Sequence, residues 1–552
     1  MAGEDTETLR SQIKTKFGGM LDDKLVEDCI ILCQNYGITG EELLYKWEAM
    51  SFGISPRVFN ADTIPALKQH IQRELAKQNA KKLHAKSSTS GLMSRNLNAR
   101  AVPSVPLQNV SRSKPNISAA ATSASGTNAF AAGPSKVKLV VPGQDEQAKR
   151  ERHYRYMYEK LSERSGSLDD RIDDIAELVQ KHYSIVELSD PSLETEEDVT
   201  VVGRIVLDAD ASSTGPVKLN EASLTLESSR ALGSGKRVAL KFDANVRVRG
   251  APKGMQGAGF FPGAIVALRG RNGGGGWFLV NEVLSLPTLA PPPLPARTID
   301  GNFSMCVAAG PYTADADLEF GAWESLLKRA RSTKPSVICL DGDLDRNPAT
   351  MFREVFLNKL SELLDDLPGS IALIVPSVRD IVSDHAVFPQ SDLQIEGDLD
   401  PRITMLPNPC RFSVNDVWFA ATSVDVLFHL RKEEYFKRAS DISPTGDDSQ
   451  SWDGMKTLCL HLLQQHSLYP LFPPPIDLMH DVDLDISHSD LLHLGDEEQR
   501  PPHVLILPSK LKQFEKTVDM VTVINPSSVT KDSAVDILWT ESSNSLEILI
   551  GK

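Results

Sequence analysis

The first 80 residues alternate polar stretches with apolar stripes at the spacing of helices. One stripe consists of positions three or four apart along the chain: Leu25, Val26, Cys29, Ile30 and Cys33. Gly37 suits the end of that helix, and Thr39 with Glu42 forms a capping box for the next. A third helix is expected from Thr63 toward Lys77. Residues 1–80 are therefore predicted to form a small N-terminal helical domain.

Residues 81–147 lack this periodicity and are rich in Ser, Ala, Asn, Gly and Pro. No Asp or Glu occurs between Glu74 and Asp145, whereas Lys and Arg recur throughout. The segment is predicted to be a disordered basic linker. A solubilising tether, a nuclear import signal and a weak contact with DNA all remain open. Its many Ser and Thr residues would be accessible to phosphorylation.

Residues 148–190 are expected to be a helical lead-in to the next domain. A charged helix is predicted from Glu146 through the sequence RERHYRYMYEKLSER, followed by an apolar stripe that includes Ile172, Ile175 and Val179. Tyr154 and its aromatic neighbours could stack on bases. Packing against the following domain is the favoured interpretation, because helical positions so close in sequence fan around the axis.

Residues 191–295 contain five short alternating stretches with turn punctuation, a pattern typical of an OB-fold β-barrel. Such barrels can bind single-stranded nucleic acid through basic and aromatic side chains. The basic candidates are Lys236, Arg237, Lys241, Arg247, Arg249, Arg269 and Arg271. The aromatic candidates are Phe242, Phe260, Phe261, Trp277 and Phe278, of which several lie in apolar strands and are expected in the core. Protein–protein use of the barrel is the stronger interpretation, and a DNA-binding module is the alternative.

Residues 296–552 alternate buried-strand runs with helices, which favours a layered α/β domain with functional turns at the strand ends. Five such runs end in small polar residues: FSMCVAAG, PSVICLDGD, SIALIVPS, VWFAATS and HVLILPS. Two acidic insertions, Ser440–Asp453 and His480–Glu498, are expected to be mobile loops. The whole chain is thus predicted to be a multidomain α+β protein.

Composition narrows the functional classes. The net charge of −15 disfavours strong duplex binding by the whole molecule. Six scattered cysteines without CxxC pairs indicate a reducing compartment. No apolar run approaches the ~18 residues of a membrane span, so no membrane association is expected.

The strand-end turns of the last domain resemble those of calcineurin-like metallophosphoesterases, in which Asp, His and Asn side chains hold two metal ions. Here the first turn reads Ala308-Ala309-Gly310. The second keeps Asp343 but has Arg346 in place of the second Asp. One such carboxylate cannot hold a metal pair. Asp343 is instead expected to pair with an arginine.

At the third turn, Val378 and Arg379 stand where that family has Asn and His, and Asp380 follows. The last turn has Ser509 and Lys510 and lacks His. Arginine near the site would oppose cation binding. The sequence therefore predicts a vacated catalytic centre marked by Asp343, Arg346, Arg379, Asp380 and Ser509. No enzymatic activity, metal or cofactor is expected, and an active phosphoesterase is the weaker alternative.

Other metal motifs are incomplete. Asp481, Asp483 and Asp485 begin like an EF-hand loop, but Leu492 stands where the bidentate Glu should be. A zinc site built from His480, His488 and His493 is less favoured than a solvated loop. Cys29 and Cys33 are expected to pack in a core rather than bind metal.

A set of ordered motifs carries a more specific resemblance. Four stretches resemble, in this order, the B-subunit family of DNA polymerase alpha: IVPSVRDIVSDHAVFPQ, NPCRFSVNDVWFAATSVDVLFHL, LLQQHSLYPLFPPP and VLILPSKLKQF. The resemblance implies an OB-fold followed by an inactive phosphoesterase-like domain. The N-terminal helices with a long tether favour the alpha type over the delta type.

The resemblance also implies a nuclear, non-catalytic scaffold of the polymerase alpha–primase complex, acting in DNA replication and lagging-strand priming. Its implied partners are the C-terminal zinc-containing domain of the catalytic subunit, the primase subunits, and other replication factors through the N-terminal domain. DNA contact would be weak or indirect. The candidate contact surface is rigid and aromatic: Tyr469, Pro470, Phe472, Pro473 and Pro474. A loop that braces the domains is an equal alternative for these residues.

Overall fold

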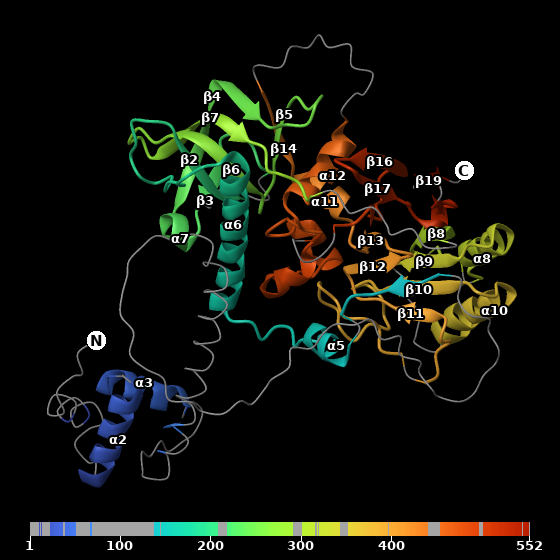
Figure 1. Ribbon diagram of the computed structural model, residues 1–552, viewed down its shortest axis with the longest axis horizontal. Coiled ribbons are helices and arrows are strands. Elements are labelled where there is room, and N and C mark those ends of the chain that lie inside the picture. Colours follow the sequence, from blue (N-terminus) through green and yellow to red (C-terminus); the bar gives the residue numbers. More distant parts are fainter. Residues whose placement is uncertain are drawn as a thin grey trace, which may run out of the picture. The chain divides into compact units, whose positions relative to one another are not determined.

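The structure is a computed structural model (Figure 1). The chain divides into two compact units, Met1–Ser123 and Ala124–Lys552. The structure describes the following residues: 10, 13, 23–36, 39–50, 64, 67–68, 137–143, 145–207, 218–290, 301–314, 317, 319–342, 352–395, 397–439, 453–495, 501–541, 543 and 545–550.

In the first unit, helices α2 (Asp23–Tyr36) and α3 (Gly40–Met50) pack on a small apolar core. Cys29 and Cys33 lie one turn apart on α2 and are both buried in that core, without a disulfide. This agrees with their expected packing role. Most of the third predicted helix, and residues 81–136 of the predicted linker, lie outside the described residues.

In the second unit, five strands close into a barrel in the order β2-β3-β4-β7-β6, which confirms the predicted OB-type domain. The strands are β2 (Val199–Leu207), β3 (Leu224–Glu227), β4 (Arg237–Arg249), β6 (Ile265–Arg271) and β7 (Trp277–Leu284). Side chains alternate in and out: Val238 and Leu240 of β4 are buried, whereas Arg237 and Lys241 are exposed. A short helix, α7 (Arg230–Gly233), separates β3 from β4.

The remaining strands form two six-stranded sheets, here called the two-sheet domain. The first sheet has the order β1-β12-β13-β15-β17-β16, with bounds Leu139–Val140, Cys410–Val414, Val417–Ala421, Val504–Ile506, Val521–Asn525 and Phe514–Val518. The second has the order β11-β10-β9-β8-β18-β19, with bounds Ile403–Met405, Ile371–Val375, Val337–Asp341, Phe303–Ala309, Val535–Thr540 and Ser545–Ile550. A dry core fills the space between the sheets.

Helices cover the outer faces of this sandwich. The second sheet is covered by α8 (Gly321–Thr333), the π-helical turn η2 (Phe352–Leu357) and α10 (Asn358–Asp366), which share its outer core. Helices α11 (Val426–Glu433) and α12 (Gly454–Gln464) pack with the first sheet in a core that continues into the barrel. The barrel and the two-sheet domain are therefore joined by continuous apolar packing.

The lead-in differs from its prediction. Helix α5 (Glu146–Arg152) stops early, and α6 (Leu161–Tyr183) starts only after a non-helical stretch. Within that stretch the Tyr154 hydroxyl donates to Pro389 O at 2.7 Å, and its ring stacks on His488. Tyr154 therefore packs on the two-sheet domain, and tertiary contacts override its helical pattern.

The end of the predicted linker is also ordered. Leu139 and Val140 form β1, which pairs antiparallel with β12 at Val414 and Ser413. Because edge pairing depends on a partner more than 270 residues away, local composition could not reveal it.

The insertion expected to be mobile at His480–Glu498 is ordered up to Gly495. It contains the last two residues of the 3-10 segment η3 (Ile476–Asp481) and all of the 3-10 segment η4 (Ile486–Leu492), with Val482, Ile486 and Leu492 buried. Residues 440–452 of the other insertion lie outside the described residues, as do residues 291–300, 343–351, 496–500 and 551–552. Among the residues described, no helix has the length and apolarity that crossing a membrane requires.

Candidate functional site

The strand-end turns of the two sheets lie together around one pocket. A pocket of about 220 Å³ lies among the turns that follow β8, β9, β10, β13, β15 and β17. Its lining includes Gly310, Gly342, Arg379 and Ser509, from four of those turns. Asp380, next to the lining, is buried. Asp343 and Arg346, also predicted here, lie outside the described residues.

Positive charge dominates the mouth of this pocket. Arg379 and Lys510 both line it, and both approach Asp481, at 3.5 and 3.7 Å. Lys531 is a third lining cation. Asp481, the observed partner of Arg379, comes from the insertion that was expected to be mobile. The expected pairing of Asp343 with an arginine falls outside the described residues.

Asp341, at the end of β9, was not among the site residues predicted from the sequence. Its side chain is 1% exposed, and both carboxyl oxygens lack a hydrogen-bond partner within the described structure. Burial, followed by the nearby Asp380 charge, raises the pKa of Asp341 well above its ordinary range. Asp380 itself accepts the Ser377 N–H at 2.7 Å. Burial therefore disfavours the charged form of Asp341.

Asp425 also lines the pocket, but its carboxylate has a structural role. It caps the N-terminus of α11 by accepting the Phe428 N–H at 3.1 Å, and it accepts the Lys510 N–H at 2.8 Å. Burial raises its pKa. Across the described ranges, no three His, Cys, Asp or Glu side chains are grouped so that they could hold a metal ion. The described residues around the pocket therefore include no ligand set for a metal pair.

A second feature is the joint between the barrel and the two-sheet domain. Strand β5 (Gly257–Phe260) leaves the barrel and pairs antiparallel with β14 (Tyr435–Arg438). The strand lies at the end of a glycine-rich stretch, residues 250–259. A Cβ on Gly257 would lie 2.0 Å from the Lys437 carbonyl oxygen, so the backbones meet only because this residue is glycine.

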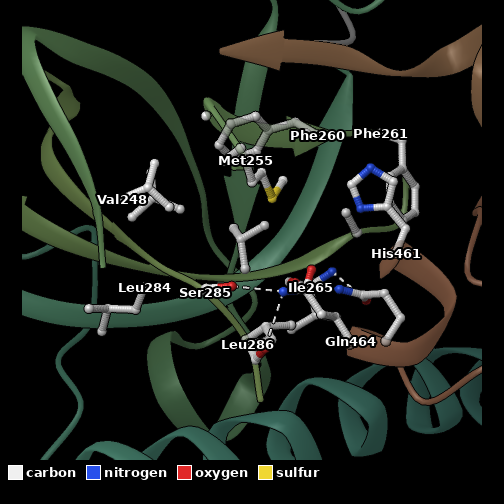
Figure 2. Close-up of a pocket in the computed structure, with 17 residues that line it drawn as sticks. Val248, Met255, Phe260, Phe261, Ile265, Leu284, Ser285, Leu286, His461 and Gln464 are labelled. Carbon is white, nitrogen blue, oxygen red and sulfur yellow. Dashed lines mark hydrogen bonds between the residues drawn. The ribbon is translucent and has the colours of Figure 1, made fainter. Parts of the chain in front are cut away.

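The end of helix α12 fixes the joint with three consecutive polar side chains. The Gln465 amide group accepts the Ile265 N–H at 2.9 Å and donates to the Ile265 carbonyl at 2.8 Å. Gln464 donates to Ser285 and Leu286, as Figure 2 shows. His466 bonds the Pro287 carbonyl at 3.2 Å. In the sequence these three residues form the run QQH inside the motif LLQQHSLYPLFPPP. No role was predicted for this run from the sequence.

The joint encloses little free space. A cavity of about 40 Å³ lies between Met255, Phe261, His461 and Gln464, which holds at most a few water molecules (Figure 2). His461 contacts Glu434 at 2.7 Å. This volume is too small for a cofactor, so the joint is a packed interface.

The aromatic and proline cluster predicted to contact a partner is mostly internal. Tyr469, Pro470 and Pro474 are buried, and the Tyr469 hydroxyl lies 2.9 Å from His429 Nδ1. Phe472 is half-buried beneath Arg204, whose guanidinium lies 5.6 Å from the ring centre, and Pro473 is exposed. The buried members thus fit the bracing alternative, and only Phe472 and Pro473 present surface.

Comparisons with known proteins define the class. Residues 165–286 match the family model for the OB domain of the B subunit of DNA polymerase alpha. Residues 305–516 match the family model for the B subunit of DNA polymerases alpha and epsilon. The chain therefore belongs to the class of DNA polymerase alpha and epsilon B subunits. Within that class, it belongs to the family of DNA polymerase alpha B subunits.

Several relatives carry the name of the DNA polymerase alpha B subunit. The protein of Schizosaccharomyces pombe is 33% identical over 407 residues, which cover 69% of this chain and 66% of that protein. The Saccharomyces cerevisiae protein is 26% identical and covers 68% of this chain and 58% of its own length. The Bos taurus protein is 28% identical, with 66% and 57% covered. The chain thus matches somewhat under two thirds of these relatives' length.

Among solved structures, Vps29 from Entamoeba histolytica aligns with 45% of this chain and 99% of its own, at 9% identity. The TM-score of 0.19 is too low to support a conclusion about the fold.

Proposed function

We propose that the chain is the non-catalytic accessory subunit of a DNA polymerase alpha–primase complex, acting in initiation and lagging-strand priming. Membership of the alpha B-subunit family carries this proposal. The rigid body built by the joint and the shared core is suited to a scaffold, because a preorganised surface loses little entropy on binding.

The two-sheet domain is an inactive calcineurin-like phosphoesterase domain. The pocket at the strand ends supports this, since it has the place of a metal centre but is lined by Arg379, Lys510 and Lys531. If the domain is inactive, purified protein with manganese will not cleave a phosphodiester above the level of an Arg379→Ala control. Turnover that depends on added metal would favour the alternative of an active enzyme.

The proposed partner is the C-terminal zinc-containing domain of the catalytic subunit, held beside the joint. Exposed apolar side chains support this location: Ile476 is 74% and Met479 48% exposed, and both follow Phe472 and Pro473 closely in the chain. Isolated apolar residues are common on surfaces, but this group adjoins a polar rim formed by the exposed ion pair of Lys432 with Asp477.

Co-expression with a C-terminal fragment of the catalytic subunit, followed by size exclusion, tests the function. A stoichiometric complex is expected, and Ile476→Asp with Met479→Asp should weaken it strongly. Met520→Asp is the matched control, because Met520 is 70% exposed on the β16–β17 hairpin. Failure of the unaltered chain to form any complex would contradict the scaffold function. Equal loss in the control would contradict only the location.

The N-terminal helices and the linker are proposed to recruit other replication factors, with primase held through the assembled complex and the protein in the nucleus. A tether raises the effective concentration of its attached module near the body. Deleting residues 1–136 should leave the complex with the fragment of the catalytic subunit intact. Nuclear accumulation of a fluorescent fusion, with and without those residues, tests the localisation.

A further inference from the structure

The outward face of three neighbouring barrel strands carries a group of cations. Strand β7 lies between β4 and β6 in the barrel, so their outward side chains form rows across the three strands. In one row Arg271 of β6 and Lys241 of β4 flank Leu279 of β7. In the next, Arg269 and Arg247 flank Glu282. With strands about 4.8 Å apart, the two cations of a row lie on opposite sides of a strip about 10 Å wide.

These four cations have no ion-pair partner among the described residues, and all four are exposed. Other basic side chains of the barrel have partners: Arg204 and Arg237 both bond Glu227, Lys236 bonds Ser192, and Arg249 lies over the Tyr183 ring. Glu282 is the single carboxylate inside the two rows. The strip therefore has a local excess of positive charge on a chain whose net charge is −15.

One aromatic ring stands at the end of the strip. Trp277, opposite Ala239, is 39% exposed, and the Lys241 ammonium lies 3.4 Å from the centre of its ring. Among the other aromatic candidates of the barrel, Phe260, Phe261 and Phe278 are buried in the core. Phe242 is half-buried, with its ring against Phe260 and Lys437. Trp277 is thus the aromatic side chain of this group that can offer a ring face to a ligand.

We propose that the outward face formed by Lys241, Arg247, Arg269, Arg271 and Trp277 binds single-stranded nucleic acid, with the cations on phosphates and a base on the indole. Guanidinium groups match phosphate oxygens in bidentate pairs, and an indole face accepts any base. An acidic peptide would satisfy the charges, but it would leave the aromatic ring without a partner. The proposal does not depend on the scaffold function, since it concerns a different face and a different ligand.

The test is the affinity of the full chain for a fluorescent oligothymidine, measured by anisotropy over a range of salt concentrations. Each phosphate contact contributes about −0.7 to the slope of log K against log salt for single strands. Replacing Lys241, Arg247, Arg269 and Arg271 by Gln should therefore make the slope shallower by about 3. Trp277→Ala should weaken binding roughly 5- to 150-fold with the slope almost unchanged, and Trp277→Phe should restore most of the loss.

Lys328→Gln with Arg431→Gln is the matched control, because both residues are exposed cations on helices of the two-sheet domain without an ion pair among the described residues. The basic segment 81–138 is present in every variant, so its contribution cancels in the comparison. Circular dichroism should show unchanged folding. An unchanged salt slope in the fourfold variant would overturn the proposal. It would also be overturned if polyglutamate competed with the oligonucleotide and Trp277→Ala left the affinity unchanged.

Discussion

The side chain of Gln465 forms the same two hydrogen bonds with Ile265 that a neighbouring strand would form, one accepted from the N–H and one donated to the carbonyl. Ile265 begins β6 of the barrel, and Gln465 follows α12 of the two-sheet domain. A single amide thereby extends the barrel's hydrogen bonding into the next domain, and both residues are buried.

Gln465→Ala should lower the free energy of unfolding by about 2–6 kcal/mol, because it leaves two buried backbone groups of Ile265 unpaired at ~1–3 kcal/mol each. Chemical denaturation of the full chain measures this. Gln464→Ala is the control, since its bonds to Ser285 and Leu286 are only half-buried and water can replace them. Equal losses in the two variants would contradict the role given to Gln465.

Gly257→Ala should separate β5 from β14. The added Cβ would meet the Lys437 carbonyl oxygen at 2.0 Å, and both atoms belong to paired strands, so the strands must move apart. We expect faster amide hydrogen exchange at Tyr435–Arg438 and a lower melting temperature. Gly273→Ala provides the comparison, because nothing lies within 4 Å of its Cβ position. Slow exchange retained in the Gly257 variant would show that the pairing does not depend on this glycine.

Asp341→Asn should stabilise the protein at neutral pH, because the amide is neutral without binding a proton, whereas the buried carboxyl must take one up at a cost of about 1.4 kcal/mol for each pH unit above its unfolded pKa. The folded pKa of Asp341 is raised, so its stability contribution is complete below the unfolded pKa of ~3.9 and falls as the pH rises toward the folded value. The advantage of the Asn variant should therefore grow with pH above ~4. The exposed Asp366→Asn should show no such trend. A pH-independent difference would mean that Asp341 is not held neutral.

His429 should make the fold sensitive to acid. Burial lowers its pKa to about 4, against ~6.5 when unfolded, while Tyr469 holds the neutral ring. Because the folded pKa is depressed, this stability is present above ~6.5 and is lost as the pH falls toward 4, by about 3 kcal/mol in all.

The measurement is urea denaturation between those two pH values, for the unaltered chain and for His429→Gln. The variant should lose less stability over the interval, although His385 and His466, whose pKa values burial also lowers, will contribute to both proteins. Parallel curves for the two proteins would rule out His429 as the source.

The sequence pattern predicted the barrel strands and the turns at the ends of the buried strands. The alternation in β4 and β6 indicated barrel strands, and the buried runs ending at Ala309 and Val375 indicated strand-end turns. The convergence of Arg379 and Ser509 followed from those turns. These features could be predicted because strand period and turn chemistry act over a few residues.

What the sequence could not reveal depends on distant partners. The pairing of β1 with β12 and of β5 with β14 joins segments roughly 180 to 280 residues apart. Tyr469 looked like a contact residue because it is aromatic and flanked by proline, but packing against Phe388 and His429 buries it. Asp341 precedes the recognised Gly342-Asp343 motif, and only its environment shows that its charge is suppressed.

The strand pair β5–β14 has a consequence for anyone who divides this chain. Separating the barrel from the two-sheet domain would remove the backbone pairing of β5 with β14. It would also expose the apolar core that α12 shares with the barrel, and both fragments would be prone to aggregate. The function of each surface is therefore best tested with point substitutions in the intact chain, in which the barrel and the two-sheet domain stay together.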